Sequence, residues 1–205
     1  SAFGEWKCDE TMEDLQAKDS TDGIIIIGID NGGLSRINEY SPWVNAQYGG
    51  GEGDEYMDFI IQTLKPFIDK SYRTLPSKEN TIIAGSSMGG VISYYAVLKY
   101  PEVYGKAGIF SPAFWTAPLL KEFTDSVSKK VNAKFFFYMG GQEGERNIQL
   151  MNEMTEKLAT NSNTMIYSVV DKTGKHNEAA WRKWFAEFYN WMMADGYNNV
   201  IKLEE

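Results

Sequence analysis

The sequence has 205 residues, a formal net charge of −8 and an isoelectric point near 4.8. Its 43% hydrophobic and 23% charged residues are typical of a globular protein, and we expect residues 1–205 to form a single domain. No basic block is present, which argues against nucleic acid or an anionic membrane surface as a partner. The single cysteine, Cys8, excludes an internal disulfide and a cysteine-rich metal site.

No stretch approaches the apolar length of a membrane span, and the N-terminus lacks the basic-then-apolar pattern of a signal peptide. A signal removed before Ser1 would leave the same sequence. We therefore expect a soluble protein that is cytoplasmic or secreted, and the sequence sets neither its compartment nor its oligomeric state.

The first third of the chain predicts two helices, a strand and a long loop. A short helix is expected at residues 12–18. The unbroken β-branched run IIIIGI at residues 24–29 predicts a strand buried on both faces of a parallel sheet. Residues 36–53 predict a long loop whose aromatic residues either line a substrate cleft or pack the loop down. Helical spacing covers residues 55–70, and Pro66 predicts a kink or break near Lys65.

Strands and helices alternate along the rest of the chain. Strands are expected at residues 81–84, 106–110, 135–139 and 164–170; helices are expected to run to about Tyr100, over 119–131 and 148–158, and along an apolar face from Trp181 to Met192. This alternation predicts an α/β fold with a mostly parallel central sheet covered by helices on both faces.

The segment Gly85-Ser86-Ser87-Met88-Gly89 predicts a nucleophile elbow with Ser87 at its tip. A serine on a sharp strand-to-helix turn is strained, so Gly85 and Gly89 are expected to be small for steric reasons. The Met88 N–H would then lie at a helix N-terminus and stabilise an oxyanion. A Gly/Ser turn can join any strand to any helix, but the strand predicted before it and the helix after it favour the elbow.

The only histidine, His176, lies in a loop directly after a predicted strand and is the natural base for Ser87. The chain order nucleophile, acid, histidine places the acid after the strand that ends at Met139. Glu143 is preferred there, with Glu145 as the substitute. Either glutamate could instead be a solvated loop carboxylate, and a Ser–His dyad without an acid is the remaining alternative.

Several motifs together resemble the putative-esterase group of the α/β-hydrolase fold. They are GSSMGG after TIIA, GIDNGGLSRINEY with SPW behind it, IDKSYRT, SPAFW, FFFYMGGQEGE and GKHNEAAW. The group contains carbohydrate esterases acting on acetylated or feruloylated xylan, siderophore esterases, S-formylglutathione hydrolases and mycolyl transferases. The resemblance implies a serine hydrolase with Ser87 as nucleophile, His176 as base, an acid on the loop of Glu143, and the Met88 N–H as an oxyanion donor.

The sequence departs from this group at its start. Members carry a strand and a loop with the second oxyanion donor before the segment that GEWKCDET resembles, and that segment begins here at Gly4. We therefore expect an α/β-hydrolase sheet that lacks its first strands. The second oxyanion donor stays unassigned.

The function expected is that of a serine carboxylic-ester hydrolase working through an acyl-enzyme. Its expected partner is a small-molecule or carbohydrate ester, such as an acetyl or feruloyl ester of xylan type. Trp43 and Trp115 are the candidate substrate-binding residues. No metal or organic cofactor is expected, because one histidine without a cysteine cluster cannot supply the usual zinc ligands. The alternatives are a siderophore esterase, an acyltransferase of the same fold, and a catalytically silent binding domain.

Overall fold

The structure is a computed structural model that describes residues 4–18, 23–161, 163–194 and 200–204. Its centre is an all-parallel five-stranded sheet with the order β1-β2-β3-β4-β5. The strands are β1 (Ile82–Ser86), β2 (Lys106–Phe110), β3 (Lys134–Gly140), β4 (Met165–Asp171) and β5 (Val200–Glu204). Each strand pairs with the strand before it in the chain, so the sheet grows in one direction. The predicted α/β class is confirmed.

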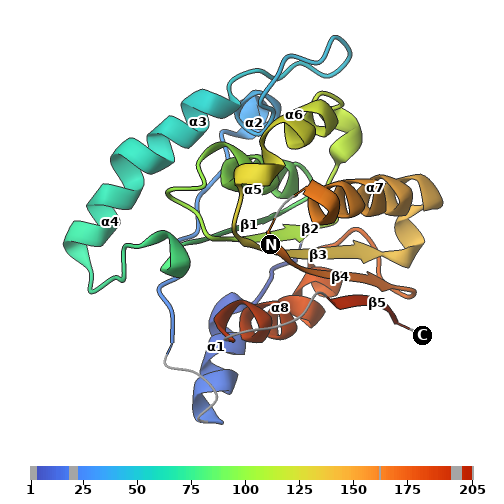
Figure 1. Ribbon diagram of the computed structural model, residues 1–205. Helices are drawn as coiled ribbons and strands as arrows, with labels where there is room; N and C mark the ends of the chain where they lie inside the picture. The colour runs from blue at the N-terminus through green and yellow to red at the C-terminus, as the bar shows by residue number, and fades with distance from the viewer. Residues whose placement is uncertain (1–3, 19–22, 162, 195–199, 205) are drawn as a thin grey trace.

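Helices cover both faces of this sheet (Figure 1). The helices are α1 (Cys8–Ala17), α2 (Arg36–Glu39), α3 (Gly53–Phe59), α4 (Lys65–Ser71), α5 (Met88–Lys99), α6 (Leu120–Val127), α7 (Glu145–Asn161) and α8 (Glu178–Met193). Figure 1 shows α5, α6 and α7 above the sheet and α1 and α8 below it. None of the described helices is long and apolar enough to cross a membrane.

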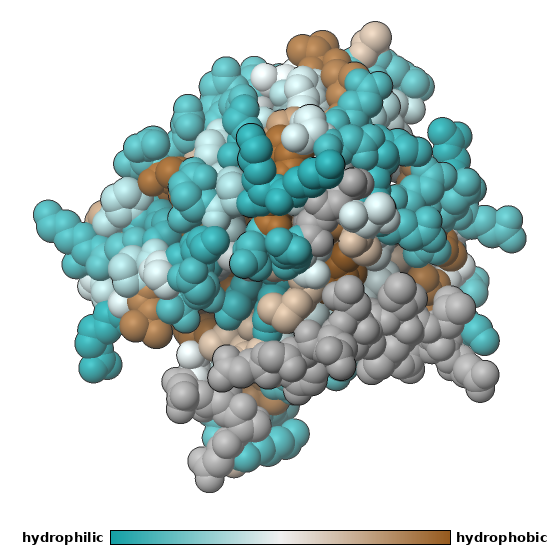
Figure 2. Space-filling model, in the orientation of Figure 1, coloured by the Kyte–Doolittle hydropathy of each residue, from teal (hydrophilic) through white to brown (hydrophobic). Residues whose placement is uncertain are grey.

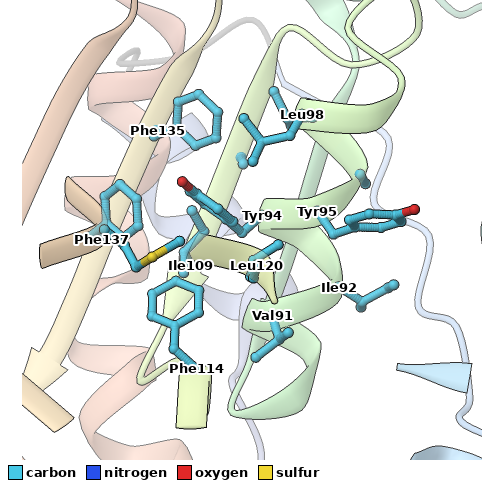
Figure 3. Packing of buried hydrophobic residues seen from close by; sticks show 14 of the residues in the cluster. Val91, Ile92, Tyr94, Tyr95, Leu98, Ile109, Phe114, Leu120, Phe135 and Phe137 are labelled. Carbon is cyan, nitrogen blue, oxygen red and sulfur yellow. The ribbon is translucent and has the colours of Figure 1, made fainter. Parts of the chain in front are cut away.

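The two faces of β3 form the two hydrophobic cores. Phe135 and Phe137 belong to the core under α5, α6 and α7, whereas Phe136 and Tyr138 belong to the core over α8. The ring of Tyr94 on α5 lies 5.7 Å from Phe135 and 6.0 Å from Phe137 between ring centroids, and Figure 3 shows these side chains meeting. All seven residues of β3 are buried, as expected for a central strand with helices on both sides.

The prediction of a strand at residues 24–29 is wrong. This segment is neither helix nor strand, and its isoleucine side chains are 36–47% exposed. The sequence pattern reports only that β-branched residues favour extended backbone, whereas a strand also needs a neighbour to complete its hydrogen-bonding ladder. Among the described strands none pairs with this segment, and β1 pairs with β2 alone.

Two other elements refine the sequence prediction. The helix expected at residues 55–70 is divided by a π-helical turn, Ile60–Leu64, just before Pro66. Proline lacks an N–H and crowds the preceding turn, so the hydrogen-bonding pattern changes there. The sequence pattern does not predict β5, although its backbone pairs in parallel with β4.

The surface agrees with this layered arrangement. On the face shown in Figure 2, hydrophilic residues cover most of the molecule and hydrophobic atoms emerge in small, separate patches.

The carboxyl ends of the strands align, since Ser86 pairs with Phe110, Phe110 with Tyr138, and Gly140 with Asp171. The loops that follow β1, β2, β3 and β4 therefore meet at one edge of the sheet.

Candidate active site

Ser87 lies at the turn between β1 and α5 in a strained backbone conformation. Its φ of 58° and ψ of −120° are outside the regions that residues with a Cβ ordinarily adopt. Hydrogen bonds hold the turn: the Ser87 N–H donates to the Phe110 carbonyl at 2.9 Å, and the Ser87 carbonyl accepts from Gly90 at 3.1 Å and Val91 at 3.2 Å. The hydroxyl is thus carried on a fixed backbone at the start of a helix.

The glycines around Ser87 differ in their steric importance. A Cβ on Gly85 would lie 2.7 Å from the backbone carbon and oxygen of Gly89, so Gly85 is required for the close approach of strand and helix. A Cβ on Gly89 would meet no atom within 4 Å. The expectation that Gly89 must be small is therefore wrong, because a side chain at position 89 has room. The backbone of Gly89 restricts the side chain at position 85 instead.

The structure brings Glu143 to His176. Glu143 Oε2 lies 2.6 Å from His176 Nδ1, and the glutamate side chain is 3% exposed while the histidine is 47% exposed. Glu145 instead begins α7 and is exposed to solvent. An ionised carboxylate only accepts hydrogen bonds, so Nδ1 carries the proton in this contact and Nε2 is left to accept one.

The two loops that carry these residues are bonded to each other. The Gln142 N–H donates to the Gly174 carbonyl at 3.0 Å, and a Cβ on Gly140 would lie 2.6 Å from the backbone of Gly174. Glycine at position 140 therefore permits the close approach that places the Glu143 loop against the His176 loop.

Asp171, at the end of β4, anchors the start of the His176 loop. Its carboxylate accepts hydrogen bonds from Lys183 Nζ at 2.7 Å, Trp184 Nε1 at 3.1 Å and the Thr173 N–H at 3.0 Å. Burial by itself raises the pKa of Asp171, but these hydrogen bonds outweigh it and hold the pKa well below its usual value. The ionised aspartate therefore ties the loop to the first turns of α8.

Ser87, His176 and Glu143 line one cavity of about 250 Å³. Its lining residues are Ser87, Ser111, Pro112, Ala113, Trp115, Glu143, Asn147 and His176. Among the described residues no hydrogen bond joins Ser87 to His176, although the two share this cavity. Catalytic hydrogen bonds are often long before substrate binds, so the separation is compatible with proton transfer.

The predicted oxyanion donor, Met88, is the first residue of α5, and its side chain is buried. In the described part of the chain its N–H has no hydrogen-bond acceptor, as expected in the first turn of a helix. This N–H is available to a ligand beside Ser87.

The two tryptophans predicted to bind substrate lie in different places. Trp115 lines the cavity, is 42% exposed, and packs its ring edge-to-face with Tyr48 at 4.9 Å. Trp43 instead packs into the core against Tyr95 and Phe123, at 5.4 and 5.6 Å between ring centroids. The structure therefore brings Trp115, and not Trp43, to Ser87.

Sequence reasoning missed Ser111 and Asn147 as lining residues. Ser111 directly follows β2 and Asn147 lies in the first turn of α7, so both belong to the same sheet edge as Ser87. Their place after a predicted strand was the only available signal. Asn147 Nδ2 donates to the Glu143 carbonyl at 2.8 Å and so fixes the loop that carries Glu143.

A second hollow, of about 330 Å³, contains neither Ser87 nor His176. It is lined by Ile29, Asp30, Gly32, Glu39, Glu52, Glu55, Tyr56 and Phe59. Within the described residues, no group of three or more His, Cys, Asp or Glu side chains is arranged to hold a metal ion. The predicted nucleophile and base, Ser87 and His176, line only the smaller of these two cavities.

The sequence model of the family described as Putative esterase matches residues 1–192. The chain belongs to the Putative esterase family. A curated relative, the uncharacterized protein YbbA of Bacillus subtilis, is 28% identical over 154 residues, which are 72% of this chain and 61% of YbbA. The chain thus spans about three fifths of the length of this relative.

Solved structures share the fold of this Putative esterase chain. The BES protein of Bacillus cereus has a TM-score of 0.70 at 18% identity, covering 84% of this chain and 68% of its own. The enterobactin esterase FES of Shigella flexneri has a TM-score of 0.65 at 18% identity, covering 89% and 48%. A ferulic acid esterase has a TM-score of 0.63 at 14% identity, covering 91% and 77%.

Proposed function

We propose that this protein is a serine carboxylic-ester hydrolase with Ser87 as nucleophile, His176 as general base and Glu143 as the acid that orients it. The observation that carries the proposal is the 2.6 Å contact between Glu143 Oε2 and His176 Nδ1 in the cavity that Ser87 also lines. Membership of an esterase family supports the reaction class.

The proposed reaction has two steps. His176 Nε2 takes the proton of the Ser87 hydroxyl as the oxygen attacks the ester carbonyl carbon, and the resulting imidazolium gives that proton to the leaving alcohol. Water then attacks the acyl carbon as it loses a proton to the same nitrogen, and the resulting imidazolium returns that proton to the Ser87 oxygen as the acid is released. Glu143 keeps Nδ1 protonated throughout and stabilises the imidazolium.

The Met88 N–H is the proposed oxyanion donor. It lies one residue after the nucleophile, at the positive end of the α5 dipole, where charge develops on the carbonyl oxygen. A second donor is not assigned in this chain, and the loss of one donor typically lowers kcat by about a hundred- to a thousandfold.

For the substrate, we propose an acyl ester of a carbohydrate, with Trp115 and Tyr48 as an aromatic wall beside the reacting carbonyl. Sugar rings and aromatic acids both stack on such exposed rings. None of the eight cavity-lining residues is Lys or Arg, so the cavity offers no cation to a strongly anionic ester. The structural similarity to a ferulic acid esterase supports this choice, and the similarity to an enterobactin esterase makes that substrate the comparison to test.

The test is labelling with a fluorophosphonate followed by peptide mapping. We expect one adduct, on Ser87, and no labelling or ester hydrolysis above background in Ser87→Ala or His176→Ala. The matched control is Ser86→Ala, which removes the neighbouring hydroxyl and should leave labelling intact. Activity that survives in Ser87→Ala, or an adduct elsewhere, would refute the assignment of the nucleophile.

A panel of esters tests the substrate class. We expect faster hydrolysis of acetylated and feruloylated xylo-oligosaccharides than of enterobactin, together with a raised KM for the xylan esters in Trp115→Ala. Trp43→Ala serves as a comparison, because it removes a core ring and should lower stability without a selective rise in KM. A preference for enterobactin would overturn the carbohydrate proposal while leaving the serine mechanism in place.

A further inference from the structure

Ser111 has an unusual backbone conformation for a buried residue at the end of a central strand. It follows β2 directly, is 1% exposed and has a φ of 46°, in the left-handed region that favours glycine. Its N–H donates to the Tyr138 carbonyl at 2.7 Å, which holds the strained residue in place. Backbone strain of this kind clusters at functional sites.

The Ser111 hydroxyl lies between an indole and the carboxylate of the proposed acid. Trp181 Nε1, on α8, is 2.8 Å from Ser111 Oγ, and Ser111 Oγ is 2.6 Å from Glu143 Oε1. An indole nitrogen can only donate a hydrogen bond, so it occupies a lone pair of the serine oxygen. The single hydroxyl proton is therefore free to be donated to Glu143.

The two carboxylate oxygens of Glu143 have different hydrogen-bond partners. Oε1 of Glu143 accepts from Ser111 and also from the Gly140 N–H at 2.9 Å. Oε2 is left to face His176 Nδ1 at 2.6 Å. Because both donors act on one oxygen, rotation of the carboxylate away from His176 would break two hydrogen bonds in a buried place.

We propose that Ser111, oriented by the Trp181 indole, is the positioning residue that holds the Glu143 carboxylate with Oε2 toward His176. Ser111 acts through Glu143 and not on the substrate, and the inference rests on the proposed function of the Ser87 site. Trp181 contributes a second contact, because its ring packs edge-on against the His176 ring at 5.2 Å between centroids. A glutamate has one more rotatable bond than an aspartate, so it has more need of such a support.

Ser111→Gly separates this role from a structural one. Glycine adopts a φ of 46° without strain, so the backbone is preserved while the hydroxyl is removed. We expect a fall in kcat of about tenfold to a hundredfold with little change in KM, since an imprecisely held catalytic group costs rate more than binding. The Gly140 N–H remains on Oε1, so the loss should be partial.

The single histidine allows a readout that needs no turnover. In ¹⁵N NMR of the full chain labelled at His176, the wild type should show one tautomer with the proton on Nδ1. Ser111→Gly should show exchange between tautomers, and Trp181→Phe, which keeps a ring against His176 but removes the indole N–H, should show a smaller change of the same kind. The matched control is Trp191→Phe, which removes from the same helix an indole N–H that has no hydrogen-bond partner among the described residues.

A folded Ser111→Gly protein with a wild-type His176 tautomer and kcat within about twofold of wild type would overturn the proposal. If Ser111→Gly does not fold, Trp181→Phe decides, and an unchanged His176 spectrum there would overturn it. The proposed function fails separately, through a wild-type protein that neither hydrolyses esters nor labels at Ser87. The NMR measurement would still report whether Ser111 orders the Glu143–His176 pair.

Discussion

The carboxylate of Glu143 and the imidazole of His176 meet at 2.6 Å, with the first side chain 3% exposed and the second 47% exposed. The carboxylate is therefore buried, whereas nearly half of the imidazole side chain is exposed to solvent. A negative charge shielded from water interacts more strongly with a neighbouring imidazolium than an exposed one would.

Glu143→Gln tests this arrangement. The amide can donate where the carboxylate only accepts, which favours the wrong tautomer of His176, and we expect kcat/KM to fall by at least about a hundredfold. Glu145→Gln is the matched control, since it neutralises the exposed glutamate two residues along, and its activity should stay within about twofold. Hydrolysis of an activated ester measures kcat/KM for both variants. Equal losses in the two would contradict the assignment of Glu143 as the acid.

The turn around Ser87 provides a second prediction, from two glycines four positions apart. Gly85→Ala places a methyl group 2.7 Å from the Gly89 backbone and should abolish fluorophosphonate labelling or unfold the protein. Gly89→Ala meets no atom within 4 Å and lies inside α5, so it should keep labelling and stabilise the helix by up to about 1 kcal/mol. Thermal melting and labelling of both variants check this, and the reverse order of damage would show that the turn is built differently.

Much of the candidate site could be predicted because its residues follow the carboxyl ends of predicted strands. The strand at Lys106–Phe110 is found where its pattern predicted it, and Ser87, Glu143 and His176 each follow a strand that the sequence indicated. Parallel strands bring such positions to one edge, so their meeting follows from order along the chain. Choosing Glu143 over Glu145 needed only its distance from the strand end.

Other features depend on contacts that no local pattern contains. The hydrogen bond that orients Ser111 comes from Trp181, 70 residues further along the chain, and sequence reasoning placed Trp181 only on an apolar face. Trp43 and Trp115 have similar loop surroundings in the sequence, yet one packs in the core and the other lines the cavity. Spacing predicts which residues share an element, and only packing between elements decides where their side chains point.

Asp171 makes the free energy of unfolding depend on pH. Its folded pKa is lowered from 3.8, so its hydrogen bonds stabilise the native state above that value and lose their contribution as the pH falls below it. Asp171→Asn should lower the free energy of unfolding by about 1.5–3 kcal/mol at neutral pH. The difference from wild type should be constant above about pH 5 and shrink steadily toward pH 3.

Urea unfolding of both proteins at several pH values measures the Asp171 effect. A difference that grows as the solution is acidified would have the wrong sign for an aspartate with a lowered pKa. Lys183→Met removes the exposed partner of the same carboxylate and should show a smaller loss with the same pH dependence.

Cys8 is expected to be chemically quiet at neutral pH. Burial raises the pKa of its thiol to about 11, helped by the charges of Asp9 and Glu10, so little thiolate forms. At pH 8 the native protein should react with iodoacetamide about a hundredfold more slowly than the protein unfolded in urea. Mass spectrometry of the alkylated chain gives both rates, and rapid alkylation of the native state would show that α1 does not shield the thiol.

The isoleucines of residues 24–29 provide a last prediction, because their sequence indicates a core and the structure exposes them. Ile26 is 45% exposed and Phe137 of β3 is fully buried. Ile26→Thr should therefore change the free energy of unfolding by no more than about 0.5 kcal/mol. Phe137→Ala should cost about 3–5 kcal/mol, since it leaves a cavity in the hydrophobic core.

The same exposure gives the isoleucine run a second measurable effect. Exposed apolar side chains favour association between molecules, so Ile26→Lys should raise the protein concentration at which aggregation begins. Light scattering measures that concentration, and a lysine on the exposed face of α7, such as Gln149→Lys, controls for the added charge. If Ile26→Thr instead lowered the free energy of unfolding as much as Phe137→Ala, the isoleucine side chains would be packed in solution and not exposed as the structure has them.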